Sequence, residues 1–141
     1  MYKKKSGSVC AAAIKRIITV AGIACVAAGG SLVAQAGEFV EVNVYFQGSC
    51  PKYVDNWDVV VGKTPPQRVR WTAWNLDGSA RNKTVDYDIV FDPFVGPHPV
   101  SKNQGIVESQ PVSQKTPAGA MFKYTIDANG CAALDPFIRI Q

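Results

Sequence analysis

The chain has 141 residues, of which 47% are hydrophobic and 18% charged, and its formal net charge at pH 7 is +4. This length suffices for one domain with one hydrophobic core. Five of the 15 Lys and Arg lie in residues 1–36, so the remaining ten stand against all 11 Asp and Glu. The positive charge thus belongs to the first segment, and the rest has no basic run with interleaved aromatics that would mark a nucleic-acid surface.

Residues 1–36 have the organisation of an export signal. An apolar run over residues 17–33 precedes Ala34-Gln-Ala36, an A-x-A cleavage site. The basic residues before that run are Lys3, Lys4, Lys5, Lys15 and Arg16. The pattern predicts cleavage near Ala36 and a single domain over 37–141 that is periplasmic or secreted, with no membrane attachment after cleavage.

Two alternatives to a cleaved signal remain. A membrane anchor is one, although a run of about 17 uncharged residues is at the lower limit for crossing a bilayer. The other is a lipoprotein signal at Cys25, where Gly22 occupies the position that usually holds a large apolar residue.

Removal of the signal leaves two cysteines, Cys50 and Cys131. Two cysteines in an exported chain predict one disulfide, and a pair of free thiols is the alternative. A bond between them would close a loop of about 80 residues and stabilise the fold by roughly 4 kcal/mol on the chain-entropy estimate.

Alternating apolar residues predict strands in the first half of the chain. Glu38–Phe46 is the first, followed by a break at Gln47–Pro51 and a second strand at Trp57–Val61. Thr64–Pro66 is a connection, because consecutive prolines cannot donate to a β-ladder. Arg68–Asn75 is the next strand. The residues expected on the inner faces are Val40, Val42, Val44 and Phe46 in the first strand, and Val69, Trp71 and Ala73 in the last.

The second half begins with a polar turn at Leu76–Lys83, marked by Asp77-Gly78. Val85–Phe91 alternates again and predicts a strand, whereas Asp92–Gly119 holds five prolines and reads as a loop with short extended pieces. Met121–Ile140 predicts two strands around a turn that carries Cys131. Its expected inner residues are Phe122, Tyr124, Ile126, Ile138 and Ile140.

Six to eight short strands without helical periodicity predict an all-β fold, an antiparallel β-sandwich. The hairpin motifs Val59-Val-Val-Gly-Lys63 and Val69-Arg-Trp71, a long Pro/Gly loop, and Phe122-Lys-Tyr-Thr-Ile126 before a cysteine loop resemble the cupredoxin family. The resemblance implies a Greek-key sandwich, and an immunoglobulin-like sandwich is the alternative. It also places the last loop near the end of the first strand, where Cys131 would meet Cys50.

The resemblance carries over no copper ligand. A blue-copper site needs two imidazoles, a thiolate and a weak axial ligand. The loop Asp127–Asp135 contains Cys131 but neither histidine nor methionine, and His98 is the only histidine in the chain. No metal or other cofactor is therefore expected.

Other residues could carry function. Asp86 and Asp88 share a strand face and could act as general acid and base or bind Ca²⁺, although the solvent-exposed face of a strand is the simpler interpretation. Trp74 falls on the polar face of its strand, in an N-terminal half that also holds Tyr45 and Tyr53, and could stack on a sugar or contact a partner.

The long loop adds two candidate contacts, Phe94 and His98, on a segment stiffened by prolines and expected to face a partner. Together these features predict an exported, non-catalytic binding or structural module with an unknown protein or envelope ligand as partner. A metal-binding electron carrier and a small secreted hydrolase using Asp86 and Asp88 are the alternatives.

Overall fold

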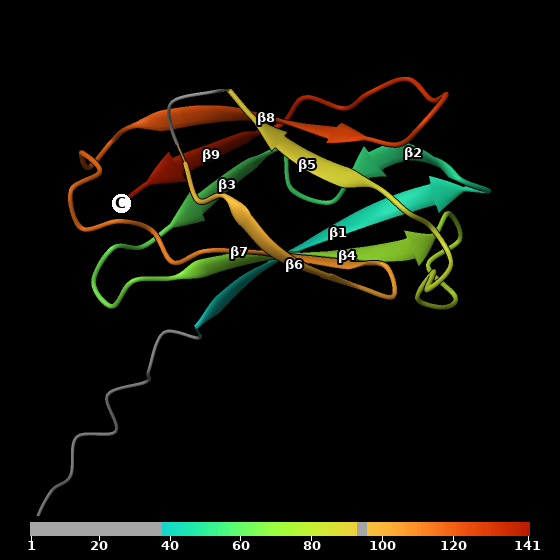
Figure 1. Cartoon of the computed structure of the whole chain (residues 1–141), viewed down its shortest axis with the longest axis horizontal. Coiled ribbons are helices and arrows are strands. Elements are labelled where there is room, and N and C mark those ends of the chain that lie inside the picture. Colours follow the sequence, from blue (N-terminus) through green and yellow to red (C-terminus); the bar gives the residue numbers. More distant parts are fainter. Residues whose placement is uncertain (1–37, 93–95) are drawn as a thin grey trace, which may run out of the picture. The chain divides into compact units, whose positions relative to one another are not determined.

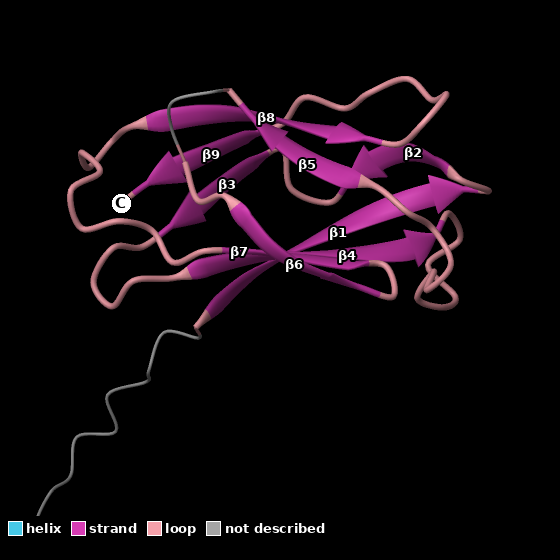
Figure 2. Ribbon diagram, in the orientation of Figure 1, coloured by secondary structure: helices cyan, strands magenta, loops and turns pink. Residues whose placement is uncertain are grey.

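A computed structural model describes residues 38–92 and 96–141, which form two packed β-sheets without a helix (Figure 1, Figure 2). The predicted all-β sandwich is confirmed. The export signal and Phe94 lie outside the described residues. The strands are β1 (Phe39–Gln47), β2 (Cys50–Val54), β3 (Asp58–Val61), β4 (Arg68–Asn75), β5 (Asp88–Phe91), β6 (Pro99–Asn103), β7 (Ile106–Ser109), β8 (Met121–Asp127) and β9 (Phe137–Ile140).

The five-stranded sheet has the order β2-β1-β4-β7-β6, and the four-stranded sheet has the order β3-β9-β8-β5. Both sheets are mixed, because β1 pairs in parallel with β4 and β3 pairs in parallel with β9. The expectation of purely antiparallel sheets was wrong. Parallel neighbours need a crossover, and here the chain supplies one by leaving β2 for β3 in the other sheet before it returns at β4.

The core lies between the two sheets and uses the alternation that the sequence shows. Every predicted inner residue is buried except Val40, which is partly buried. Trp71 on β4 and Tyr124 on β8 are fully buried, with ring centroids 5.4 Å apart across the sandwich. Because each strand turns one face inward, every second residue is left for an outer surface.

β2 was not predicted, because Gln47–Pro51 reads as an interruption. The strand pairs with β1 at the edge of the sheet, where a proline does not break a ladder. Tyr45 pairs with Tyr53 and the next residue of β1 pairs with Pro51, which leaves Lys52 as the extra residue of a β-bulge. The bulge tilts the strand and changes the direction of the side chains beside it.

The other differences lie in the middle of the chain. β5 begins at Asp88 and is shorter than the predicted strand Val85–Phe91. The predicted loop Asp92–Gly119 contains the β6–β7 hairpin, whose turn residues Gln104 and Gly105 have φ angles of +47° and +76°. Two-residue hairpins favour positive φ angles of this kind. β7 lies between β4 and β6, so this part of the segment is an inner strand and not a surface loop.

Two buried tyrosines differ in their hydrogen bonds. Tyr87 donates from its hydroxyl to the carbonyl oxygens of Trp71, at 3.1 Å, and Gly105, at 3.3 Å, and so links the layers of the sandwich. The hydroxyl of Tyr124 has no hydrogen-bond partner among the described residues, and neither has Nε1 of Trp71. An unpaired buried hydroxyl costs stability, whereas a paired one does not.

Replacement of each tyrosine by phenylalanine should therefore have opposite effects. Tyr87→Phe is expected to lower the free energy of unfolding by about 1–2 kcal/mol, because two carbonyl groups lose a donor. Tyr124→Phe is expected to leave it unchanged or raise it by up to about 1 kcal/mol. Denaturant unfolding of the two variants measures the difference, and equal losses would contradict the distinction.

Alkaline titration gives a second readout for the same pair. Burial raises the pKa of Tyr124 to about 12. The unfolded chain releases this proton near pH 10 while the folded protein retains it, so stability is lost as the pH rises from about 10 to 12. Tyr124→Phe removes this contribution, and its stability should fall less steeply over that interval.

Candidate functional site

Three aromatic side chains lie in one row on the outer face of the five-stranded sheet. Tyr53 on β2, Tyr45 on β1 and Trp74 on β4 occupy paired positions on three adjacent strands. The rings of Tyr45 and Tyr53 are stacked, with centroids 4.4 Å apart and planes 12° from parallel. We call these three residues the aromatic row.

The stacking of Tyr45 on Tyr53 determines which ring face of the aromatic row is exposed to solvent. Adjacent strands are about 4.8 Å apart, so rings stacked at a similar spacing stand side by side across the strands. One face of the Tyr53 ring is covered by Tyr45, and the other points beyond β2, the edge strand of the sheet. Tyr53 is 41% exposed, so an aromatic face is held rigidly at the edge of the sheet.

Trp74 is fixed by hydrogen bonds rather than by stacking. Its Nε1 donates to Oδ1 of Asn43 at 2.7 Å, and Nδ2 of Asn43 donates to Oδ2 of Asp55 at 2.6 Å. Asp55 also accepts from the backbone N–H of Asn43 at 2.9 Å. The indole is half-buried and held in one orientation. A pre-ordered side chain loses little entropy when it contacts a ligand.

The opposite end of the same face is charged and internally paired. The guanidinium of Arg70 lies 2.6 Å from a carboxylate oxygen of Glu108 and 3.0 Å from one of Glu41. It also lies 3.7 Å from the ring centroid of Phe39. Partial burial works against the charge of Arg70, but the two carboxylates outweigh it and raise its pKa. The charged side chains at this end of the sheet face are therefore already paired with one another.

A hollow of about 500 Å³ opens beside the aromatic row, where β1 and β4 end. Its polar lining comes from Gln47, Asn75 and Asp77, and its apolar lining includes Leu76, which is 38% exposed. The hollow adjoins the row through the following turn, because a Cβ added at Gly78 would lie 3.8 Å from the Tyr45 ring.

The polar groups of the hollow differ in their existing partners. Oδ1 of Asp77 accepts from the N–H and the hydroxyl of Ser79 at 3.0 and 2.7 Å, and these bonds lower the pKa of Asp77. Its carboxylate is therefore ionised at neutral pH. The side-chain amide of Gln47 is exposed and has no hydrogen bond to the described residues. The hollow thus offers a charged acceptor and an unpaired amide beside aromatic rings.

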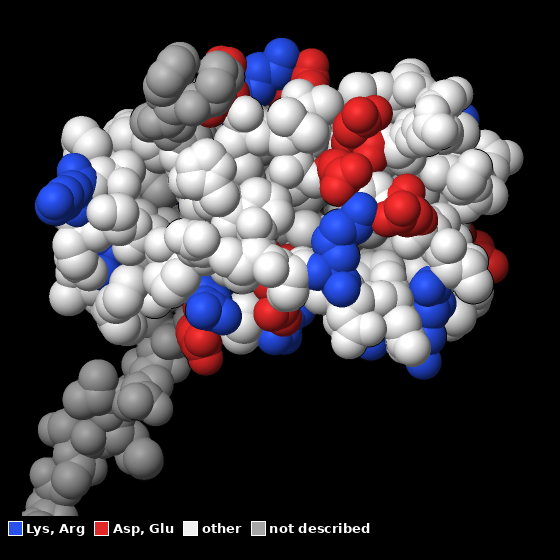
Figure 3. Space-filling model, viewed as in Figure 1, with Lys and Arg blue, Asp and Glu red and all other residues white. Residues whose placement is uncertain are grey.

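The carboxylate pair predicted from the sequence meets a lysine. Nζ of Lys102 on β6 lies 2.7 Å from Oδ1 of Asp86 and 2.9 Å from Oδ1 of Asp88. Since β5 and β6 are edge strands of different sheets, these ion pairs join the two layers at the open edge of the sandwich. Figure 3 shows acidic side chains beside a basic one over this part of the molecule.

The contact with Lys102 keeps Asp86 ionised at neutral pH. The hydrogen bond from Lys102 and its positive charge lower the pKa of Asp86. A general acid needs the opposite shift, so that it holds its proton at neutral pH. Both carboxylates are also strongly exposed, with 89% and 68% of the Asp86 and Asp88 side chains accessible. The surroundings suit an ion pair at the sheet edge better than an acid–base pair.

His98 precedes β6 and its side chain is exposed. Its ring centroid lies 6.1 Å from that of Phe91, in an edge-to-face arrangement. Its carbonyl oxygen accepts from the N–H of Gln110 at 2.7 Å, which ties this segment to the residue after β7. His98 does not join the aromatic row, and Phe94 lies outside the described residues.

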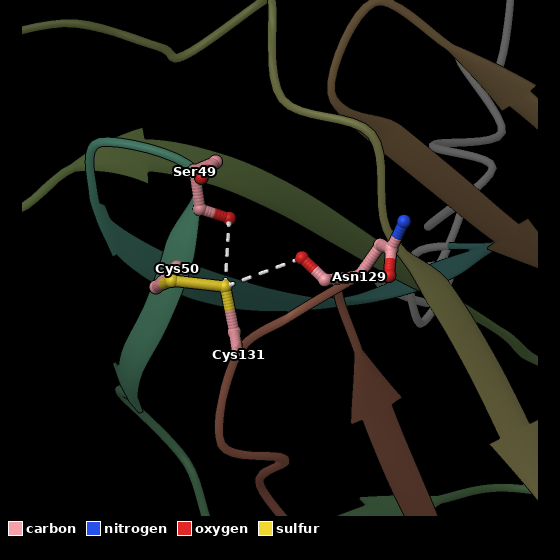
Figure 4. The surroundings of a disulfide bond; sticks show 4 residues. All are labelled: Ser49, Cys50, Asn129 and Cys131. Atoms are coloured by element: carbon pink, nitrogen blue, oxygen red, sulfur yellow. Dashed lines mark hydrogen bonds between the residues drawn. A yellow bond between two sulfur atoms is a disulfide. The ribbon is translucent and has the colours of Figure 1, made fainter.

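The predicted disulfide is confirmed. Cys50 at the start of β2 is bonded to Cys131 in the loop between β8 and β9, with Cα atoms 5.3 Å apart (Figure 4). The carbonyl oxygens of Ser49 and Asn129 each lie 3.8 Å from Sγ of Cys131. The bond joins the two sheets at the end of the sandwich near the aromatic row, and Cys131 has no thiolate left to offer a metal.

Within residues 38–92 and 96–141, no three His, Cys, Asp or Glu side chains gather where they could hold a metal ion. The same residues include no helix that could cross a bilayer. The disulfide is compatible with a secreted or periplasmic protein.

A scan against protein-family models finds no match for this chain, and a search of curated proteins finds no significant match.

Proposed function

We propose that this protein is an exported, non-catalytic binding module that recognises a ligand of the cell envelope or exterior through the aromatic row. The observation that carries the proposal is the in-register placement of Tyr53, Tyr45 and Trp74 on one outer face. Exposed aromatic groups on a rigid scaffold are characteristic of recognition surfaces, because they bury a large area at a small entropic cost.

The chemistry of the face supports binding rather than catalysis. The charged groups on this face already have partners: Asp55 accepts a hydrogen bond from the Asn43 amide, and Arg70 is ion-paired with Glu108. Such groups position neighbouring side chains and leave few ionisable groups free for proton transfer.

The cupredoxin-like assignment without copper is part of the same proposal. It is supported by the two-sheet architecture together with the sequence motifs. The expected hairpin between Val59–Lys63 and Val69–Trp71 is not formed, because β3 and β4 lie in different sheets. The disulfide at Cys131 supports the absence of a blue-copper centre, because such a centre needs a free thiolate. Export is supported by the signal-like N-terminus and by the disulfide.

Binding can be tested with the protein recovered after export from cells that carry the full chain. The fraction that co-sediments with envelope material should fall about tenfold or more for Tyr53→Ala, the loss expected when a central aromatic contact worth more than about 1.4 kcal/mol is removed. Val90→Ala is the matched control, because Val90 is 50% exposed but lies on the four-stranded sheet.

Unchanged thermal midpoints would show that both variants fold. If Tyr53→Ala and Trp74→Ala both co-sediment like the unaltered protein, the aromatic row is not the recognition surface. The segment around His98 would then be the next surface to examine.

A further inference from the structure

The aromatic row lies next to a hollow with polar groups at the ends of β1 and β4. The row offers an exposed aromatic face at Tyr53, held by the stacked ring of Tyr45. The hollow offers the unpaired amide of Gln47 and the carboxylate of Asp77. A ligand that contacts both would combine an apolar flat side with several hydrogen-bonding groups.

We propose that the ligand is a neutral polysaccharide, an inference that rests on the proposed function and names its ligand class. A pyranose ring has a face of C–H groups that packs against an aromatic ring, while its hydroxyls donate to carboxylates and exchange hydrogen bonds with amides. Tyr53 takes the C–H face of one sugar, and Gln47 and Asp77 bond the hydroxyls of another sugar of the same chain.

The charges of the site decide between this ligand and a polyanion. Asp77 is an exposed carboxylate whose pKa is lowered, so it stays negative and repels phosphate or uronate groups. Asp55 is the other acidic group beside the row, where it accepts a hydrogen bond from the side chain of Asn43. The cations beside the row are Lys52, the one basic residue within β2, and Arg81, which forms a β-bridge with Trp74. Asp55 and Asp77 balance them, so the surface has no net positive charge to attract a nucleic acid or an acidic glycan.

The geometry also requires a chain of sugars rather than a single one. Tyr45 and Gln47 are two residues apart on β1, which places the hollow about 7 Å along the strand from the row. The exposed face of Tyr53 lies on the far side of its stacked partner. One sugar ring cannot fill both positions, so an oligosaccharide should compete for the site and a monosaccharide should not.

Affinity electrophoresis in native gels tests the proposal. It uses the protein recovered after export from cells that carry the full chain. The probes are a soluble β-glucan, a xylan and a galactomannan, with alginate as the polyanion control. We expect at least one neutral polymer to retard the protein and alginate to have no effect. Tyr53→Ala should weaken retardation about tenfold and Tyr53→Phe should retain it, because the phenyl ring keeps the stacking face.

Two further variants separate the hollow from the row. Gln47→Ala should weaken retardation severalfold without changing the thermal midpoint, and Val90→Ala should behave like the unaltered protein. Retardation that is equal in Tyr53→Ala and the unaltered protein would overturn the inference.

A different outcome distinguishes the ligand class from the function. If no neutral polymer retards the protein but co-sedimentation with the envelope still depends on Tyr53, the polysaccharide inference fails while the binding function stands. Retardation by alginate alone would also overturn it, because the ligand would then be a polyanion. If neither gel retardation nor co-sedimentation depends on Tyr53, both proposals fail.

Discussion

Gly105→Ala is expected to lower the free energy of unfolding by about 2–5 kcal/mol. A Cβ at this position would overlap the carbonyl oxygen of Asn82, a backbone atom that cannot rotate away. The φ angle of +76° adds about 1–2 kcal/mol for any L side chain, and the overlap adds the cost of an overpacked contact, about 1–3 kcal/mol.

The loss should be large because the hairpin tip links several elements. The carbonyl of Gly105 accepts from the N–H of Ala73 on β4 at 2.7 Å and from the hydroxyl of Tyr87. A shift of the tip that relieves the overlap with Asn82 would therefore weaken contacts to the central strand of the sheet. The clash cannot be relieved locally.

Gly130→Ala is the matched control for this substitution. Gly130 has a similar φ angle of +78°, but an added Cβ would meet no atom within 4 Å. Gly130→Ala should therefore lower the free energy of unfolding only by the cost of the positive φ angle, about 1–2 kcal/mol. Denaturant unfolding of both variants measures the difference, and similar losses would show that the contact with Asn82 is not stiff.

The strands that the sequence alone predicts well are those with one solvent-exposed face and one buried face. β4 matches its predicted bounds, and β1 and β8 differ by a residue or so, because alternation repeats over seven or more residues in each. Their inner residues follow from the same pattern, since the pleat fixes which side chains share a face. Composition and compartment were enough to predict the Cys50–Cys131 bond.

What the sequence hides depends on pairing between distant segments. β2 is short, contains Pro51 and is bulged, so its pattern is broken although β1 supplies a ladder for it. β7 lies among prolines and glycines, yet β4 and β6 hold it inside the sheet. The parallel pairs arise from the path of the chain between the two sheets, which no local pattern encodes.

The same reason limits how far the candidate site could be predicted. Trp74 is identified by its place on the polar face of β4, and Tyr45 and Tyr53 are visible only as members of an aromatic-rich half. That the three form one row depends on the register of β2, β1 and β4. The hollow beside them is built by two loop ends that are far apart in sequence, and the Asp77-Gly78 turn signal in one of them gives no hint that the two ends meet.

Removal of the disulfide is expected to have a similarly large effect on stability. The double variant Cys50→Ser/Cys131→Ser should lose about 4 kcal/mol, because the bond spans a sequence separation of 81 residues and closes most of the domain into one loop in the unfolded chain. Reduction of the unaltered protein should produce the same loss in denaturant unfolding. A loss below about 1 kcal/mol in both cases would contradict a major structural role.

The disulfide also bears on the candidate site, because Cys50 pairs with Gln47 at the β1–β2 turn. The bond fixes the start of the bulged edge strand to the loop before β9, and the same strand carries Tyr53. At a temperature where the double variant is still folded, polysaccharide retardation should therefore fall severalfold, as the edge strand becomes free to fray. Retardation that remains unchanged in the folded double variant would show that stacking on Tyr45 alone is enough to hold the Tyr53 ring in place.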